Sequence, residues 1–297
     1  MKTKIAFWIA GCGTLTATVL RCIQMLFFFN YETGFVTDSG LFTALYCGTA
    51  LLAVLAGGIL CRLDPATCGK MGDKRSWGCG ISTLLMSLFM LFGGVGVLWD
   101  AHIYKSCGVS YFVEPSLLSF HTPFAVLSLL FGLAALITAI AWLKGGKLPG
   151  RTGALWSLGI LWGLCYMVLT FMSYSASATT EENLFTVCGG AAVVFFLLAE
   201  GKMISGVGGR KNSRLVYVFG LIASVFWLTY VLSNTILIIV GRGYATEMPY
   251  MVQLMMLMVI LHALTLLRSL QMGNFIPAEE SLERKNGARR GRKREKS

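Results

Sequence analysis

The chain has 297 residues, of which 56% are hydrophobic and only 13% are charged, and its formal net charge is +11. Soluble domains usually carry about 25% charged residues, so this composition excludes a water-soluble globular fold. The positive charge follows the membrane topology derived below, and we therefore do not expect nucleic acid to be a partner.

Apolar runs of about 18 residues or more are typical of membrane-spanning helices. The sequence contains eight such runs, at residues 5–29, 41–60, 80–99, 121–143, 154–174, 183–200, 214–240 and 249–268. We therefore predict an all-α fold: a polytopic integral membrane protein with eight transmembrane helices.

The basic residues predict how these helices are oriented. If both termini are cytoplasmic, the inner segments hold 22 of the 25 lysines and arginines, and the outer loops hold only Lys105 and Arg242. The remaining one, Arg21, lies within the first run. Membrane proteins concentrate lysine and arginine on the cytoplasmic side. We expect both termini in the cytoplasm and the chain in the cytoplasmic membrane of a bacterium.

One stretch of the chain, residues 22–58, occurs twice. A shift of 143 positions places it on residues 165–201 without a gap, and eleven of the 37 positions are then identical. So long a period indicates a duplicated half-protein rather than a solenoid. We predict two similar four-helix halves, 1–147 and 148–275. They form a parallel tandem repeat, because each half has an even number of helices.

The segment 276–297 has no apolar periodicity, and from Arg284 onward it holds eight basic residues and one acidic residue. We expect a disordered cytoplasmic tail that rests on anionic lipid, where each basic residue contributes about 1 kcal/mol. A docking arm for RNA or for an acidic partner is the less favoured alternative.

Arg21 is a charged residue within a predicted spanning helix, a placement that costs at least about 2.5 kcal/mol on insertion scales. Gln24 lies one turn away on the same face. Asn234 and Gln253, in the last two helices, fall at a similar depth. One hypothesis is that these four side chains line an outward-open pocket for an anionic group. The alternative is that Arg21 extends to the outer headgroups while the amides pair between helices.

The two outer turns of the repeat place Tyr31 and Asp38 opposite Tyr174 and Glu181. One interpretation is that the two acidic turns flank a central axis and attract a cation or an amine. The other is turn chemistry, in which the polar residues cap the following helices and the tyrosines anchor at the membrane surface.

The chain contains no recognised catalytic motif, since P-loop, H-E-x-x-H and G-x-S-x-G patterns are all missing. We predict no catalytic residue, no metal and no cofactor. His102, His121 and Asp100, around the longest outer loop, are the candidates if the protein is an enzyme acting on lipid. No apolar run has an acidic residue in its interior, so we interpret His262 as a hydrogen-bonded core histidine.

Three functions remain open. The favoured one is a non-enzymatic membrane protein that binds a small or lipid-like ligand or assists a transport complex. A transporter with its path between the two halves is disfavoured by the missing membrane carboxylate, and a membrane enzyme by the missing motifs. A homodimer or larger membrane complex is a further option, because Gly159-x-x-x-Gly163 allows close helix packing between chains or within one.

Overall fold

The computed structural model describes residues 2–30, 35–63, 76–110, 118–145, 152–174, 180–205, 209–241 and 249–271. Within these ranges the chain is nearly all helical, and eight helices are long and apolar enough to cross a membrane. The prediction of a helical, multi-pass membrane protein is confirmed in these terms, while the orientation of the termini stays a prediction.

The elements follow in the order α1 (Lys2–Phe27), β1 (Phe29–Asn30), β2 (Phe35–Val36), α2 (Leu41–Leu63), α3 (Trp77–Cys107), α4 (Leu118–Lys144), α5 (Thr152–Leu155), α6 (Ser157–Tyr174), α7 (Thr180–Ile204), α8 (Gly209–Ile239) and α9 (Tyr250–Gln271). The two short strands pair antiparallel, with Phe29 opposite Val36 and Asn30 opposite Phe35. This small hairpin departs from the prediction of an all-α fold.

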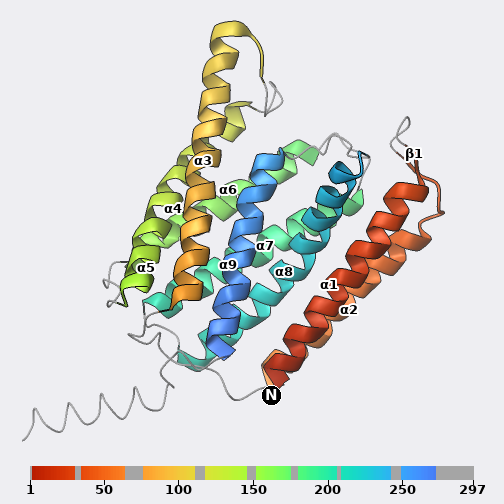
Figure 1. Cartoon of the computed structure of the whole chain (residues 1–297), viewed down its shortest axis with the longest axis horizontal. Helices are drawn as coiled ribbons and strands as arrows, with labels where there is room; N and C mark the ends of the chain where they lie inside the picture. Colours follow the sequence, from red (N-terminus) through yellow and green to blue (C-terminus); the bar gives the residue numbers. More distant parts are fainter. Residues whose placement is uncertain are drawn as a thin grey trace, which may run out of the picture.

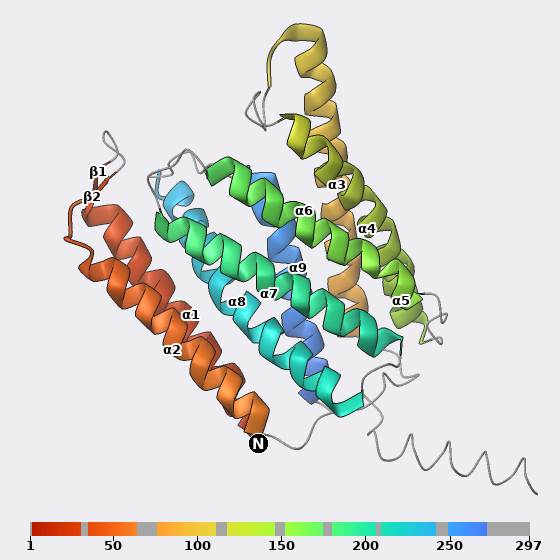
Figure 2. The ribbon, with the colours of Figure 1, turned by 180° about the vertical axis from the view of Figure 1, so that it is seen from behind.

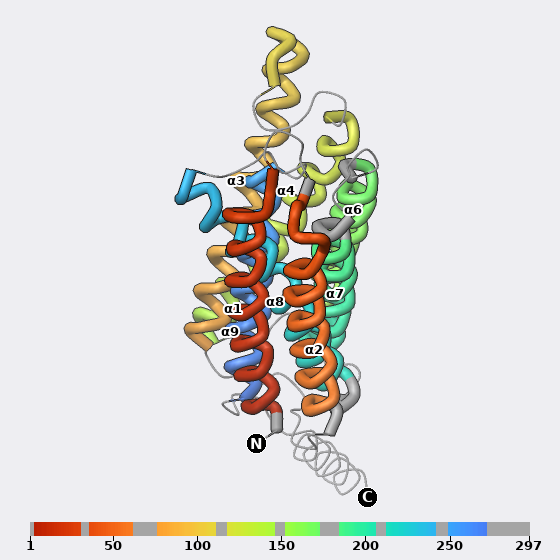
Figure 3. Tube along the Cα trace, turned by 90° about the vertical axis from the view of Figure 1, so that its right-hand side faces the viewer, coloured from red at the N-terminus to blue at the C-terminus, as the bar shows by residue number. Residues whose placement is uncertain are grey.

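The long helices form one bundle with two flanks. The pair α1–α2 lies on one flank and the pair α3–α4 on the other, with α6, α7, α8 and α9 between them (Figure 1, Figure 2). The helices α1 and α2 pack on each other and on α8, whereas α3 packs on α4 and α9. Seen from the side, α1 and α2 stand next to each other in front of α8 and α9 (Figure 3).

The two copies of the repeated stretch correspond to α1–α2 and α6–α7, and each copy is a pair of packed helices. The four helices of the predicted first half form two pairs on opposite flanks of the bundle, and each pair also packs against helices of the second half. The duplication and the division into 1–147, 148–275 and 276–297 stay predictions.

The glycines of Gly159-x-x-x-Gly163 make close contacts within the chain. A Cβ atom added at Gly159 would lie 2.6 Å from the ring of Phe131 in α4, and one at Gly163 would lie 2.8 Å from Val194 in α7. Small residues let neighbouring membrane helices approach closely. Here the motif packs α6 against α4 and α7, which is the intramolecular use of the two that the sequence allowed.

The helix α3 extends well past residue 99, where its apolar run ends. Asp100 is fully buried and accepts a 2.6 Å hydrogen bond from Ser110 Oγ, which gives the buried carboxylate a polar partner within the protein. Gly108 then ends the helix in a left-handed conformation (φ 69°), and its N–H donates to the carbonyl of Tyr104, a common helix end. His102 therefore lies on α3 and not in a loop.

Candidate functional site

An ionisable pair lies inside the bundle. Glu200 Oε1 and His262 Nε2 are 2.7 Å apart, and both side chains are completely buried. His262 is in the middle part of α9, and Glu200 is one turn before the end of α7. The prediction that the apolar runs have no internal acidic residue is therefore wrong for α7, whereas His262 is a hydrogen-bonded core histidine, as expected.

Glu200 was not predicted to lie inside a helix because of the sequence at the end of α7. The apolar run stops at Glu200, because Gly201 and Lys202 follow it. The helix nevertheless continues to Ile204, and Met203 is buried. Glu200 thus lies one turn inside the bundle, while Lys202 is exposed.

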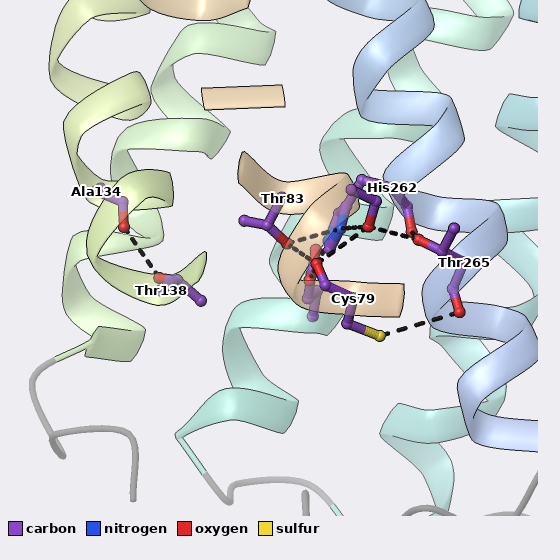
Figure 4. A network of polar contacts seen from close by, with 8 residues as sticks. Cys79, Thr83, Ala134, Thr138, His262 and Thr265 are labelled. Atoms are coloured by element: carbon purple, nitrogen blue, oxygen red, sulfur yellow. Dashed lines mark hydrogen bonds and ion pairs between the residues drawn. The ribbon is translucent and has the colours of Figure 1, made fainter. Parts of the chain in front are cut away.

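The other ring nitrogen of His262 faces hydroxyl groups of α3. Its Nδ1 is 3.1 Å from Thr83 Oγ1 and 3.3 Å from Ser82 Oγ. Both hydroxyls also donate to the carbonyl of Cys79, Thr83 at 2.6 Å and Ser82 at 3.1 Å. Thr265, one turn from His262 on α9, donates to Ser82 Oγ at 2.6 Å. Figure 4 shows Thr83 and Cys79 of α3 next to His262 and Thr265 of α9.

The hydroxyl groups beside Nδ1 can serve the imidazole in either tautomer. A hydroxyl has one proton and two acceptor lone pairs, and those of Thr83 and Ser82 lie within hydrogen-bond distance of both the Cys79 carbonyl and Nδ1. Both ring nitrogens of His262 therefore have polar partners, Nε2 on Glu200 and Nδ1 on α3. An apolar interior tolerates such a pair far better without a net charge than with one.

Aromatic rings surround the imidazole. Trp142 stacks on His262 with ring centroids 5.6 Å apart, and Trp156 and Phe196 lie at 6.3 and 6.4 Å. Trp156 is at the break between α5 and α6, and its ring packs against Gly201, where an added Cβ would lie 3.2 Å away. Aromatic rings from α4, from α7 and from the break between α5 and α6 thus enclose the imidazole of α9.

Two buried polar atoms, one within the Glu200–His262 pair and one next to it, have no hydrogen-bond partner within the described ranges. They are Glu200 Oε2 and the indole nitrogen of Trp156. Buried polar atoms without a partner are rare in native structures and require a reason. The site thus has one acceptor and one donor that form no hydrogen bond within the described part of the protein.

Arg21 is also buried, with 2% of its surface exposed. Its guanidinium carbon lies 5.8 Å from the ring centre of Tyr46 in α2 and 5.5 Å from that of Tyr230 in α8. Contacts with aromatic faces stabilise a desolvated cation by up to about 2 kcal/mol each. Arg21 therefore points into the bundle and does not extend to the headgroups.

The three amides predicted beside Arg21 have different surroundings. Asn234 follows Tyr230 by one turn on α8, is 3% exposed, and has no hydrogen-bond partner for either amide atom among the described residues. Gln253 is buried in α9, which packs on α8. Gln24 instead donates to Thr43 Oγ1 at 2.7 Å and to Asp38 Oδ2 at 3.3 Å. The structure thus brings Arg21 next to the Asn234 face of α8 and turns Gln24 toward the outer hairpin.

The outer-turn positions are described in part. Asp38 accepts hydrogen bonds from the backbone N–H of Phe42 at 2.7 Å and of Gly40 at 3.2 Å, as the capping interpretation expects. Tyr31 lies outside the described residues, and the side chains of Tyr174 and Glu181 do too. The helix α7 begins at Thr180, earlier than predicted, so Glu181 is in its first turn.

The candidates for lipid chemistry do not share one surface. His102 is exposed beside Trp99, with ring centroids 6.4 Å apart, whereas Asp100 and His121 are fully buried. Across the described ranges, no group of three or more His, Cys, Asp or Glu side chains is arranged to hold a metal ion.

Comparison with known proteins finds no matching family model, no similar curated protein and no similar solved structure.

Proposed function

We propose that this integral membrane protein is a secondary transporter in which the Glu200–His262 pair carries a coupling proton. The observation behind the proposal is a carboxyl group 2.7 Å from an imidazole, both fully buried, within helices long enough to span a membrane. Ionisable residues at such positions are expensive and mark proton relays and substrate pathways. The missing membrane carboxylate, which disfavoured transport in the sequence, is supplied by Glu200.

The position of the pair suits a coupling role. Glu200 belongs to α7, His262 to α9, and the hydroxyls that fix Nδ1 belong to α3. Gain or loss of one proton changes the net charge of the cluster by one unit, and the apolar surroundings respond to this change by favouring a different packing of these three helices. Proton binding is thereby linked to the relative positions of helices, which is how a local charge change biases a conformational equilibrium.

Infrared difference spectroscopy tests this proposal without a known substrate. Proteoliposomes cycled between mildly acidic and mildly alkaline pH should give a carboxyl C=O band that is sensitive to deuterium exchange. We expect Glu200→Gln to lose this band and Asp100→Asn, which removes another fully buried carboxyl group, to keep it. If Glu200→Gln gives the same difference spectrum as the natural sequence, the pair does not exchange a proton and the proposal fails.

A second candidate function is that of a protein that binds a small anionic ligand, for sensing or to assist a transport complex. It is favoured by the buried Arg21, which lies beside the face of α8 that carries Tyr230 and Asn234. The side-chain amide of Asn234 has no hydrogen-bond partner among the described residues. Such a site would serve the substrate of a transporter equally well.

Thermal unfolding with a panel of monocarboxylates, dicarboxylates, phosphate and amines checks this candidate. A ligand at a hundred times its Kd stabilises the folded state by about 2.7 kcal/mol. We expect the anions to raise Tm for the natural sequence and for Arg268→Leu, which removes an exposed arginine from the opposite end of the bundle. Arg21→Leu should abolish the shift. Equal shifts in all three proteins would show that Arg21 does not hold the ligand.

A further inference from the structure

A groove with a volume of about 620 Å³ runs between α2 and α8 on the surface of the bundle. It is lined by Val54, Leu55, Gly58, Ile59, Arg214, Leu215, Val218 and Ile222. All of these residues except Arg214 are apolar. Leu55, Ile59 and Leu215 are each more than 40% exposed, so the groove is open along its length to whatever surrounds the helices.

The groove lies within one leaflet of the bilayer. At about 1.5 Å per residue, Ile222 is roughly 5 Å from the midpoint of the span Asn212–Ile239, and Arg214 is roughly 17 Å from it. On α2, Val54 and Ile59 fall roughly 5 and 12 Å from the midpoint of the span Leu41–Cys61. Half of the hydrocarbon core measures about 15 Å. The apolar walls therefore lie at the depth of acyl chains, and Arg214 lies at the depth of the headgroups.

The charge of the groove is confined to this headgroup end. Arg214 is half-buried, and its Nε has no hydrogen-bond partner in the described part of the chain. A guanidinium group matches the geometry of a phosphate diester and binds it through paired N–H donors. The floor is open at Gly58, where an added Cβ would contact no atom within 4 Å.

We propose that the groove between α2 and α8 binds one anionic phospholipid, with an acyl chain along Val54, Ile59 and Val218 and the headgroup phosphate on Arg214. The bound lipid comes from the leaflet on the side of the N-terminus, which the basic residues assign to the cytoplasm. Basic pockets between helices on that side are typical binding sites for anionic headgroups. This site is separate from the Glu200–His262 pair and does not depend on the transport proposal.

Native mass spectrometry of the full-length protein tests the proposal, with phosphatidylglycerol and phosphatidylcholine of identical acyl chains as the probes. We expect one phosphatidylglycerol to bind in preference. Arg214→Gln should reduce this preference about fivefold, which corresponds to the loss of one basic residue near the headgroups. Lys202→Gln, which removes another basic residue at the same end of the bundle, should leave it unchanged.

The apolar part of the site has its own matched pair of variants. Gly58→Leu fills the groove and should weaken binding of both lipids about tenfold, a loss of 1.4 kcal/mol. Gly48→Leu introduces the same side chain on the same helix, also into open space, but outside the groove, and should bind normally. If Gly58→Leu unfolds, Gly58→Ala provides a smaller obstruction that contacts no neighbouring atom. Equal binding to the Gly58 and Gly48 variants, or an unchanged headgroup preference in Arg214→Gln, would overturn the proposal.

Discussion

Replacing Glu200 with alanine should lower the free energy of unfolding by about 3–5 kcal/mol, the range measured when one partner of a buried ion pair is removed. The reason is that His262, which is fully buried, would lose the partner of Nε2 and could keep a charge only at high cost. Ordinary hydrogen bonds between membrane helices average only about 0.6 kcal/mol. The size of the loss therefore distinguishes an ionisable pair that shares a proton from a neutral hydrogen bond.

A double-mutant cycle in mixed micelles, with SDS as the denaturant, measures this interaction. We expect Glu200→Ala with His262→Ala to be less destabilised than the sum of the single variants, because the double variant leaves neither partner unpaired. Glu200→Gln keeps a hydrogen-bonding amide beside Nε2 of the imidazole and should lose only about 1 kcal/mol. Additive single effects, each under 1 kcal/mol, would mean that the two groups are not coupled.

Replacing Gly94 with valine should destabilise the protein by about 1–3 kcal/mol, the usual cost of overpacking a close contact. A Cβ atom at this position would lie 2.9 Å from the backbone carbonyl oxygen of Ala125 in α4 and 2.9 Å from Leu129. A backbone atom cannot rotate away as a flexible side chain does. The substitution therefore has to push α3 and α4 apart over the region of Figure 1 where they lie against each other.

Gly96 provides the matched control for this prediction. It is two residues further along α3, and an added Cβ would have no neighbour within 4 Å. Both substitutions change helix propensity by the same amount, so their difference isolates the contact with α4. Gly96→Val should leave the unfolding free energy within about 0.5 kcal/mol of its original value. Equal destabilisation at Gly94 and Gly96 would show that α3 and α4 do not need this close approach.

The candidate groups differ in how far they could be predicted from the sequence. Arg21 was detectable because a lone charge interrupts an apolar run, and the structure does place it inside the bundle. Glu200 was missed because it sits at the edge of its run, directly before Gly201 and Lys202. The available signal was the pair Met203–Ile204 after Lys202, which shows that the helix continues beyond the charge. A lysine near a helix end can reach the headgroups while its neighbours stay buried.

By itself, the sequence predicted eight apolar runs long enough to cross a membrane, because the thickness of the hydrocarbon core sets the length of each run, and the structure has eight such helices within the described ranges. Only the tertiary structure decided which helices are neighbours. Glu200 and His262 are 62 residues apart, and they meet because the fold brings side chains of α7, α9 and α3 together in the bundle. Contacts between membrane helices arise from small residues, shape and paired polar groups on particular faces, and the hydropathy of a single run carries no information about its partner.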